Sequence, residues 1–222
     1  MKPEITAVIV AREGSVRIPG KNMLMLGKDT LISRKIKQLK SCKLISRIVF
    51  GSDSDEMLKH AASFGAECIK REKFYCDEKQ ASANDMIAEM MQKINTDIVV
   101  WAHCTNPLLS ASTYDKAIQT FLANYPAYDS LLSVAEFREH LWDEHKRPLN
   151  YNPWAPRHTP ARELPAYYVQ DGGIFIQPYI QMKENSYFFG KKPYLFSIPS
   201  EEFLDINTPR DYLLAKTLTS EI

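Results

Sequence analysis

The sequence predicts a single three-layer α/β domain, in which a mixed, mainly parallel sheet lies between two layers of helices. Its 222 residues are enough for one large hydrophobic core. Short apolar runs alternate with segments of helical period over residues 5–134, and this alternation is typical of a parallel sheet. No internal repeat or low-complexity tract interrupts it, so we expect one domain over residues 1–222.

The strands are predicted from continuous apolar runs. The first run, residues 5–10, is rich in β-branched side chains and ends in a loop with glycine and proline, as buried parallel strands do. The run at residues 97–102 has the same character. The full set of predicted strands is residues 5–10, 47–52, 66–69, 97–102, 130–134, 172–177 and 194–198.

The helices are predicted from apolar residues that recur at spacings of three and four. Gly65 is expected to close the second helix. Thr208 and Pro209 suit the N-cap and the first turn of the last helix. The predicted helices are residues 31–42, 55–65, 82–94, 110–125 and 207–218.

The alternation stops near Glu136. From there to about Val169 the chain is rich in proline, histidine, arginine and aromatic residues and has no clear period. Long irregular segments are uncommon inside compact domains. We therefore expect residues 138–169 to form either a flap over the active site or an arm onto a partner subunit, and we favour the arm of a homodimer.

Composition excludes several classes of protein. The 28 basic and 27 acidic residues balance, so no global field would draw the chain to nucleic acid or to an anionic membrane. No stretch approaches the roughly 20 apolar residues that cross a bilayer, and residues 5–10 are too short for a signal peptide. The four cysteines show neither the pairing of a zinc site nor the density of a secreted disulfide scaffold. We expect a cytoplasmic protein with reduced thiols.

The segment VIVAREGSVRIPGKNM, Val8 to Met23, places two glycines, three cations and a proline directly after the first strand. A loop at the carboxyl end of a parallel strand lies where α/β sheets bind ligands. Glycines let backbone N–H groups approach an anion, and arginine and lysine neutralise phosphate charge. Neither the Walker A order nor the G-x-G-x-x-G fingerprint is present. The pattern favours a phosphate-binding loop over a basic surface turn. The residues expected to bind or approach the phosphates are Arg12, Gly14, Arg17, Gly20 and Lys21.

Within this loop the string A-R-x-G-S-x-R-I-P-G-K-N resembles the nucleotide-binding signature of the sugar-acid cytidylyltransferases, the group of the CMP-sialic acid and CMP-Kdo synthetases. Later segments resemble the same family in the same order. They are FGSDSDEMLKHAASFGAECIKRE, CDEKQASANDMI, HCTNPLLS, ARELPAYYVQDGGIFI, YFFGKKP and FLDINTPRDYLLAK. Each match is weak alone, but together they cover nearly the whole chain and indicate membership of the family.

The resemblance implies a Rossmann-like nucleotidyltransferase fold, that of the nucleotide-diphospho-sugar transferases. It also implies that a sugar hydroxyl attacks the α-phosphate of CTP and that pyrophosphate is released. The implied nucleotide-binding residues are Arg12, Gly14, Ser15, Arg17, Lys21, Asn22, Arg71 and Ser82. Among these, Arg12 and Lys21 are expected to act in catalysis together with Asp205, which would ligate Mg2+ with Asn207 beside it.

The chain departs from the family pattern mainly on the sugar side. His103 stands where the sialate branch has glutamine, and Leu109 stands where it has arginine. Asn207 replaces the second aspartate of the D-I-D motif, and an amide oxygen binds Mg2+ more weakly than a carboxylate. The candidate sugar-binding residues are His103, Arg162, Phe188 and Phe189. Arg162 could equally form a salt bridge in a dimer, and the two phenylalanines could equally be core residues.

Three further candidates have ordinary interpretations. His60 is expected to be a surface residue of a helix, and Asp53 and Asp55 are expected to cap one. The sequence thus predicts CTP-dependent activation of an acidic sugar, of the sialic type, to its CMP form for surface polysaccharide. The alternatives are a cytidylyltransferase for a Kdo-like or phosphorylated acceptor, and a catalytically weak relative that binds nucleotide as a regulatory subunit.

Overall fold

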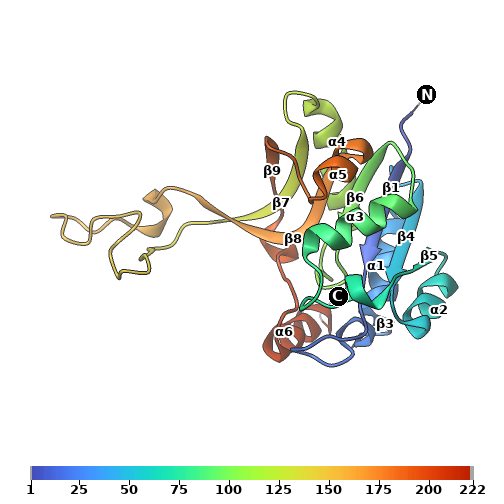
Figure 1. Cartoon of the computed structure of the whole chain (residues 1–222). Helices are drawn as coiled ribbons and strands as arrows, with labels where there is room; N and C mark the ends of the chain where they lie inside the picture. Colours follow the sequence, from blue (N-terminus) through green and yellow to red (C-terminus); the bar gives the residue numbers. More distant parts are fainter. Residues whose placement is uncertain (1, 221–222) are drawn as a thin grey trace.

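The computed structural model describes residues 2–220, which form a seven-stranded sheet with helices on both faces (Figure 1). The order of the strands is β5-β4-β1-β6-β8-β7-β9. The strands are β1 (Ile5–Val10), β4 (Arg47–Ser52), β5 (Glu67–Lys70), β6 (Ile98–Ala102), β7 (Ser130–Phe137), β8 (Tyr167–Pro178) and β9 (Pro193–Ser197), with a separate hairpin of β2 (Met25–Leu26) and β3 (Asp29–Thr30).

The predicted mixed and mainly parallel sheet is confirmed. β1 pairs in parallel with β4 and β6, while β8 runs antiparallel to β6 and β7. At 12 residues, β8 is longer than its predicted apolar core, residues 172–177. Its first half was missed because Tyr168, Val169 and Gln170 are exposed and form no continuous apolar run.

The helices cover the two faces of the sheet with separate apolar clusters. α1, α2, α4 and α6 pack with Ile5, Ala7 and Ile9 of β1, whereas α3 and α5 pack with Val8. α3 and α5 cover the face turned toward the viewer in Figure 1. The helices are α1 (Leu31–Lys40), α2 (Asp55–Ser63), α3 (Ala83–Lys93), α4 (Ala111–Asn124), α5 (Tyr179–Asn185) and α6 (Pro209–Ser220).

The predicted helix boundaries are largely confirmed by the capping residues. Gly65 follows α2 with a φ of +88°, a conformation that glycine adopts without strain. Thr208 precedes α6 and accepts a hydrogen bond at Oγ1 from the N–H group of Asp211 at 3.4 Å. The short helix α5 was not predicted, because Tyr179 and Met182 are its only buried residues and give too little periodicity.

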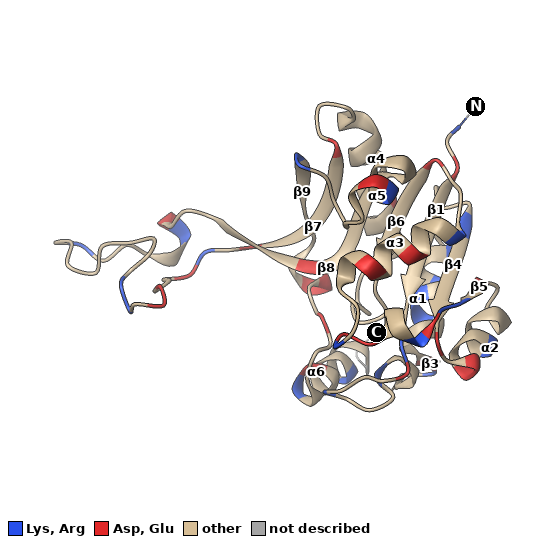
Figure 2. Ribbon diagram, in the orientation of Figure 1, with Lys and Arg blue, Asp and Glu red and all other residues tan. Residues whose placement is uncertain are grey.

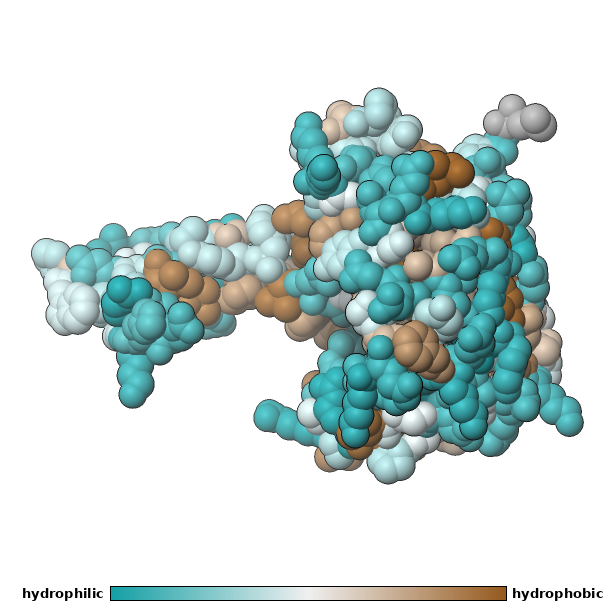
Figure 3. Space-filling model, viewed as in Figure 1, coloured by the Kyte–Doolittle hydropathy of each residue, from teal (hydrophilic) through white to brown (hydrophobic). Residues whose placement is uncertain are grey.

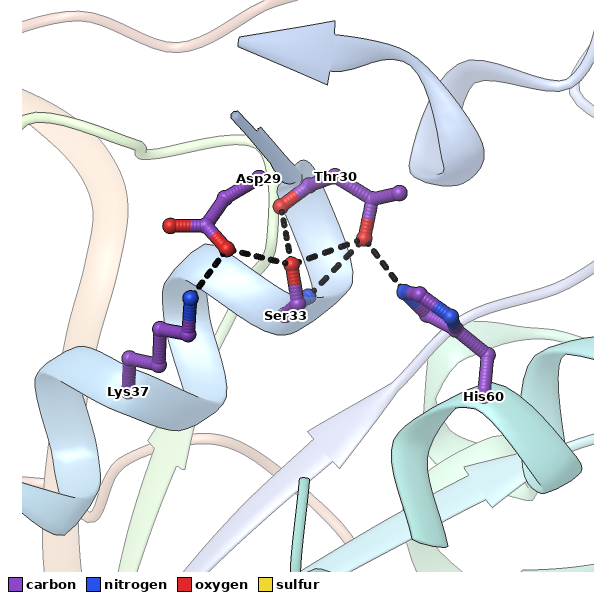
Figure 4. Close-up of polar contacts among 5 residues, drawn as sticks. All are labelled: Asp29, Thr30, Ser33, Lys37 and His60. Atoms are coloured by element: carbon purple, nitrogen blue, oxygen red, sulfur yellow. Dashed lines mark hydrogen bonds and ion pairs between the residues drawn. The ribbon is translucent and has the colours of Figure 1, made fainter. Parts of the chain in front are cut away.

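A polar network joins the start of α1 to α2 (Figure 4). Thr30 caps α1, since its Oγ1 accepts from the N–H group of Ser33 at 3.0 Å. Ser33 also donates to Asp29, which pairs with Lys37. His60 of α2 places Nε2 2.8 Å from Thr30 Oγ1. His60 is therefore not a plain surface residue, because it is half-buried and ties the two helices together.

β7 and β8 leave the body as a two-stranded stem, and the chain between them, residues 138–166, projects as an arm (Figure 1). The arm carries charges of both signs (Figure 2), and apolar residues gather at its base (Figure 3). Of residues 138–166, all described, Leu164 alone is buried, and Trp154 is 78% exposed. The arm therefore has no hydrophobic core of its own.

Within residues 2–220, no helix is long and apolar enough to cross a membrane.

Candidate active site

A pocket of about 440 Å³ opens at the carboxyl ends of β1 and β6. β4, the strand that follows β1 in the sheet, lies on one side of β1, and β6 lies on the other, so the strand order reverses between β1 and β6. Open α/β sheets bind ligands at such a reversal. The walls of the pocket come from the loop after β1, from residues 71–86, from the end of β6 and from the segment before α6.

The loop after β1 contributes most of the predicted nucleotide-binding residues to this pocket. Gly20 has a φ of +63° and precedes a short 3-10 helix, Lys21–Met23. Asn22 is nearly buried, and its Nδ2 donates to the carbonyl of Arg12 at 3.4 Å. Gly14 does not line the pocket, and a Cβ atom there would meet nothing within 4 Å. The loop residues that do line it are Arg12, Ser15, Val16, Arg17, Ile18, Lys21 and Asn22.

Asp53 braces this loop from the neighbouring strand. Its Oδ1 accepts a hydrogen bond from the backbone N–H of Glu13 at 3.0 Å. Asp53 and Asp55 were expected to cap α2, but the N-cap is Ser54, and Asp55 pairs with Lys70 at 2.6 Å. The capping interpretation of Asp53 was wrong because its partner lies 40 residues away in the sequence, a separation that local pattern does not reveal.

Four cationic side chains line the pocket, those of Arg12, Arg17, Lys21 and Arg71. Arg12 donates to the carbonyl of Cys76 at 3.3 Å and pairs with Glu78 at 2.5 Å. Lys21 donates to the carbonyl of Ile206 at 3.0 Å. Burial lowers the pKa of the Lys21 ammonium, and the charge of Asp205 opposes that shift. Such a concentration of cations with few anions favours a polyanionic ligand.

Arg71 is fixed in the wall by an ion pair. It is 3% exposed, and its Nε pairs with Glu89 at 2.7 Å while Nη2 donates to the carbonyl of Tyr75 at 3.0 Å. Ser82, also in the wall, caps α3 in a capping box with Asp85. The positive end of the α3 dipole therefore begins at the pocket, which adds to its attraction for anions.

Asp205 is the residue in the pocket best suited to hold a cation. Its Oδ2 accepts from Nδ2 of Asn207, whereas its Oδ1 is buried and has no hydrogen-bond partner. An unpaired carboxylate oxygen is the ligand that a hard cation such as Mg2+ prefers. The amide oxygen of Asn207 already accepts from Arg17 Nη2 at 2.9 Å. Within residues 2–220, no group of three acidic, histidine or cysteine residues is arranged to hold a metal ion.

His103 lines the pocket at the end of β6. The indole N–H of Trp101 can only donate, so His103 Nε2, 3.2 Å away, must be the acceptor. His103 Nδ1 therefore carries the proton and donates to the carbonyl of Gly172 at 2.6 Å. Burial also lowers the pKa of His103. With both nitrogens engaged, the neutral ring gives the pocket shape rather than a mobile proton.

The other predicted sugar-binding residues lie outside the pocket. Phe188 stacks on Phe175 with ring centroids 4.8 Å apart, and Phe189 lies 6.2 Å from the same ring, so both pack against the core. Arg162 belongs to the arm, and its side chain is 82% exposed. None of residues 138–166, all described, lines the pocket. Within one chain, the structure therefore brings His103 alone of these four to the pocket.

The chain is similar to known proteins over most of its length. The chain matches the family described as Cytidylyltransferase over residues 6–156. It is 28% identical to a pseudaminic acid cytidylyltransferase of Campylobacter jejuni, with 95% of this chain and 94% of the relative covered. It is 25% identical to N-acylneuraminate cytidylyltransferase A of Danio rerio, with 96% of this chain and 50% of that longer protein covered.

A solved structure shows the same fold. A CMP:2-keto-3-deoxy-manno-octonic acid synthetase complexed with CTP superposes with a TM-score of 0.70 at 15% identity, and the match covers 98% of this chain and 99% of that one.

Proposed function

This chain belongs to the cytidylyltransferase family, and from that premise we propose that it transfers CMP from CTP to a hydroxyl group of an acidic sugar, with release of pyrophosphate. The observation that carries the proposal is the set of four cations around the pocket where the strand order reverses. Transfer of a nucleotidyl group depends mainly on positioning and on neutralising phosphate charge. These cations supply both.

Three of the four cations have distinct parts in this proposal. Arg12 exchanges its exposed partner Glu78 for the triphosphate, and Lys21, which donates to the carbonyl of Ile206, adds an ammonium. Arg71, which Glu89 holds in place, gives a fixed guanidinium in the wall. The first N–H groups of α3 offer neutral donors to the nucleotide next to Ser82, whose own N–H and hydroxyl groups donate to Asp85.

We propose that Asp205 holds Mg2+ together with phosphate oxygens of CTP. The buried Oδ1 atom without a partner supports this assignment. When bound, the cation supplies positive charge close to the phosphates. Asn207 is the weaker ligand of the pair, because its amide oxygen carries no full charge and already accepts from the cationic side chain of Arg17.

We propose that the acceptor is an acidic 2-keto sugar of the sialic type, activated for surface polysaccharide. The names of the two relatives, for pseudaminic acid and N-acylneuraminate, support this class. His103 forms the sugar-side wall. The four cysteines of the chain are free thiols, which supports a cytoplasmic location.

We further propose that the arm pairs two subunits in a homodimer. Its exposed aromatic residues and its lack of a core support an interface. Arg162 lies on this arm, away from the pocket of its own chain. If the arm reaches a second copy, Arg162 can contact the acid group of a sugar bound there.

Pyrophosphate release from four nucleoside triphosphates against a panel of sugar acids tests the reaction. Activity with CTP and a sialic-type acid is expected. Activity with a Kdo-like or phosphorylated acceptor alone would replace the acceptor class. No activity with any pair would favour a regulatory relative, a function with which the engaged oxygen of Asn207 is consistent.

Mixing two defective variants tests the arm. Lys21→Ala and Arg162→Ala homodimers should each be weak, whereas a heterodimer holds one pocket with an intact Lys21 and an intact Arg162 from the other chain. Random reassembly should restore roughly a quarter of wild-type activity, because half of the dimers are mixed and each has one complete pocket. No recovery from verified heterodimers would exclude action between subunits.

A further inference from the structure

The loop after β6, the floor loop, lines the pocket with residues 103–105, and helix α1 holds its next two residues, Asn106 and Pro107. Three long side chains of α1 donate to two of its carbonyl groups. Arg34 Nε and Gln38 Nε2 donate to the carbonyl of Pro107 at 2.8 and 2.7 Å. Lys35 Nζ donates to the carbonyl of Asn106 at 2.8 Å. α1 thus fixes the course of the floor.

Lys35 is the most deeply buried of these donors. It is 1% exposed, and its second hydrogen bond reaches Tyr114 Oη at 2.9 Å. Tyr114 in turn donates to the carbonyl of Gly173 at 3.4 Å. Burial lowers the pKa of the Lys35 ammonium to about 7. A neutral amine still has two N–H donors, so both hydrogen bonds survive in either protonation state.

Asn106 joins the floor loop to β8 and to the segment before α6. Its side chain is 1% exposed, and Nδ2 donates to the carbonyls of Asp171 at 2.9 Å and Leu204 at 3.4 Å. A second tie lies beside it, since the N–H group of Ile206 donates to the carbonyl of Thr105 at 2.8 Å. The floor loop is therefore bonded to the residues on both sides of Asp205.

The same segment also receives Lys21. Its Nζ donates to the carbonyl of Ile206, the residue that Thr105 holds. A continuous path of hydrogen bonds and short backbone links thus runs from Lys35, through Asn106, to the segment that carries Asp205 and receives Lys21. Each donor on this path has an acceptor, although the buried Oδ1 of Asn106 has no hydrogen-bond partner. Buried hydrogen bonds of this kind favour one conformation over others.

We propose that Lys35 and Asn106 are positioning residues that hold Asp205 and Lys21 at the separation required by a complex of metal and triphosphate. This inference rests on the proposed function, because it assigns a task to residues behind that pocket. A network that served stability alone would weaken folding when cut and would leave the cooperation between Mg2+ and CTP intact. A positioning network makes that cooperation depend on Lys35.

The test uses Lys35→Met, which keeps the aliphatic stem and removes the donor. CTP binding is measured by calorimetry in excess Mg2+ and in EDTA, with no acceptor present. The coupling between Mg2+ and CTP is the ratio of the dissociation constant in EDTA to that in excess Mg2+. We expect this ratio to fall about tenfold in the variant, within the range usual for coupled sites. The matched control is Ile36→Ala on the same helix, a fully buried apolar residue that should lower Tm and keep the ratio.

Asn106→Ala gives a second route if Lys35→Met does not fold, because it cuts the path beyond α1. An unchanged ratio in either folded variant overturns the proposal. So does an equal fall of the ratio in Ile36→Ala, which would show a general effect of instability. A wild-type protein that binds CTP equally with Mg2+ and with EDTA refutes the metal assignment and this inference together, whereas intact wild-type coupling with unaffected variants refutes this inference alone.

Discussion

Replacing Lys21 with alanine should cripple turnover and leave the protein folded. The ammonium group donates to the carbonyl of Ile206 at 3.0 Å, and burial already lowers its pKa. The fold therefore holds this charge where a bound phosphate compensates it more fully than water does. Removing it costs little in the free protein and much in the complex with CTP.

The magnitude follows from what remains in the pocket. One donor to a developing oxyanion contributes about 3 kcal/mol, or about a hundredfold in rate. Three guanidinium groups, those of Arg12, Arg17 and Arg71, still line the pocket, so we expect a fall in kcat/KM of about a hundredfold rather than a thousandfold. The lost hydrogen bond to Ile206 costs about 1.5 kcal/mol in stability, which lowers Tm by about 4 °C in a chain of this size.

Pyrophosphate release and Tm should be measured on the same preparations. Lys28→Ala is the matched control, because Lys28 is an exposed lysine between β2 and β3 and does not line the pocket. It should leave both quantities unchanged. A Lys21→Ala protein whose turnover stays within a few fold of wild type would refute the assignment of the phosphate loop.

In a Mg2+ titration at saturating CTP, Asp205→Asn should sharply raise the Mg2+ concentration for half-maximal rate or stop the reaction. Asn207→Asp should lower that concentration, because it adds a carboxylate. A titration curve of Asp205→Asn that coincides with that of wild type means that Asp205 is no ligand. Deleting residues 148–160 should yield monomers in sedimentation, and an unchanged oligomer would exclude the arm as the main interface. Burial lowers the pKa of His103, so below about pH 6.5 the unfolded chain binds a proton that the folded chain refuses, and stability falls as the pH falls. His103→Gln should therefore lose less Tm than wild type between about pH 7.5 and about pH 5.5, and equal losses would contradict this account.

The central strands could be predicted because each carries its own signal. β1 and β4 are almost wholly buried, and each contains a run of apolar residues, so their observed bounds match the predicted ones. The outer half of β8 could not be predicted, because its pairing with β7 is long-range and its side chains face solvent. Local sequence records burial well and strand partners poorly.

The candidate site likewise has a part that local sequence predicts, the opening loop, and a part that it does not predict, the long-range contacts that support this loop. The residues of the opening loop lie close together in the sequence and follow a buried strand, so their gathering at one pocket could be predicted. The support behind them could not. Asp53 reaches Glu13 across 40 residues, and Asn106 reaches Leu204 across 98. Only the fold brings such pairs together, and no composition or spacing marks them beforehand.

β8 connects the arm to the part of the pocket around His103. The strand begins in the stem of the arm and reaches Gly172, whose carbonyl accepts from Nδ1 of the pocket residue His103. Within residues 2–220, no backbone hydrogen bond joins the nucleotide loop to this strand. In the proposed homodimer, separating the subunits at low protein concentration should therefore alter acceptor KM before it alters CTP affinity. A dilution series that follows both constants would show whether they change in that order.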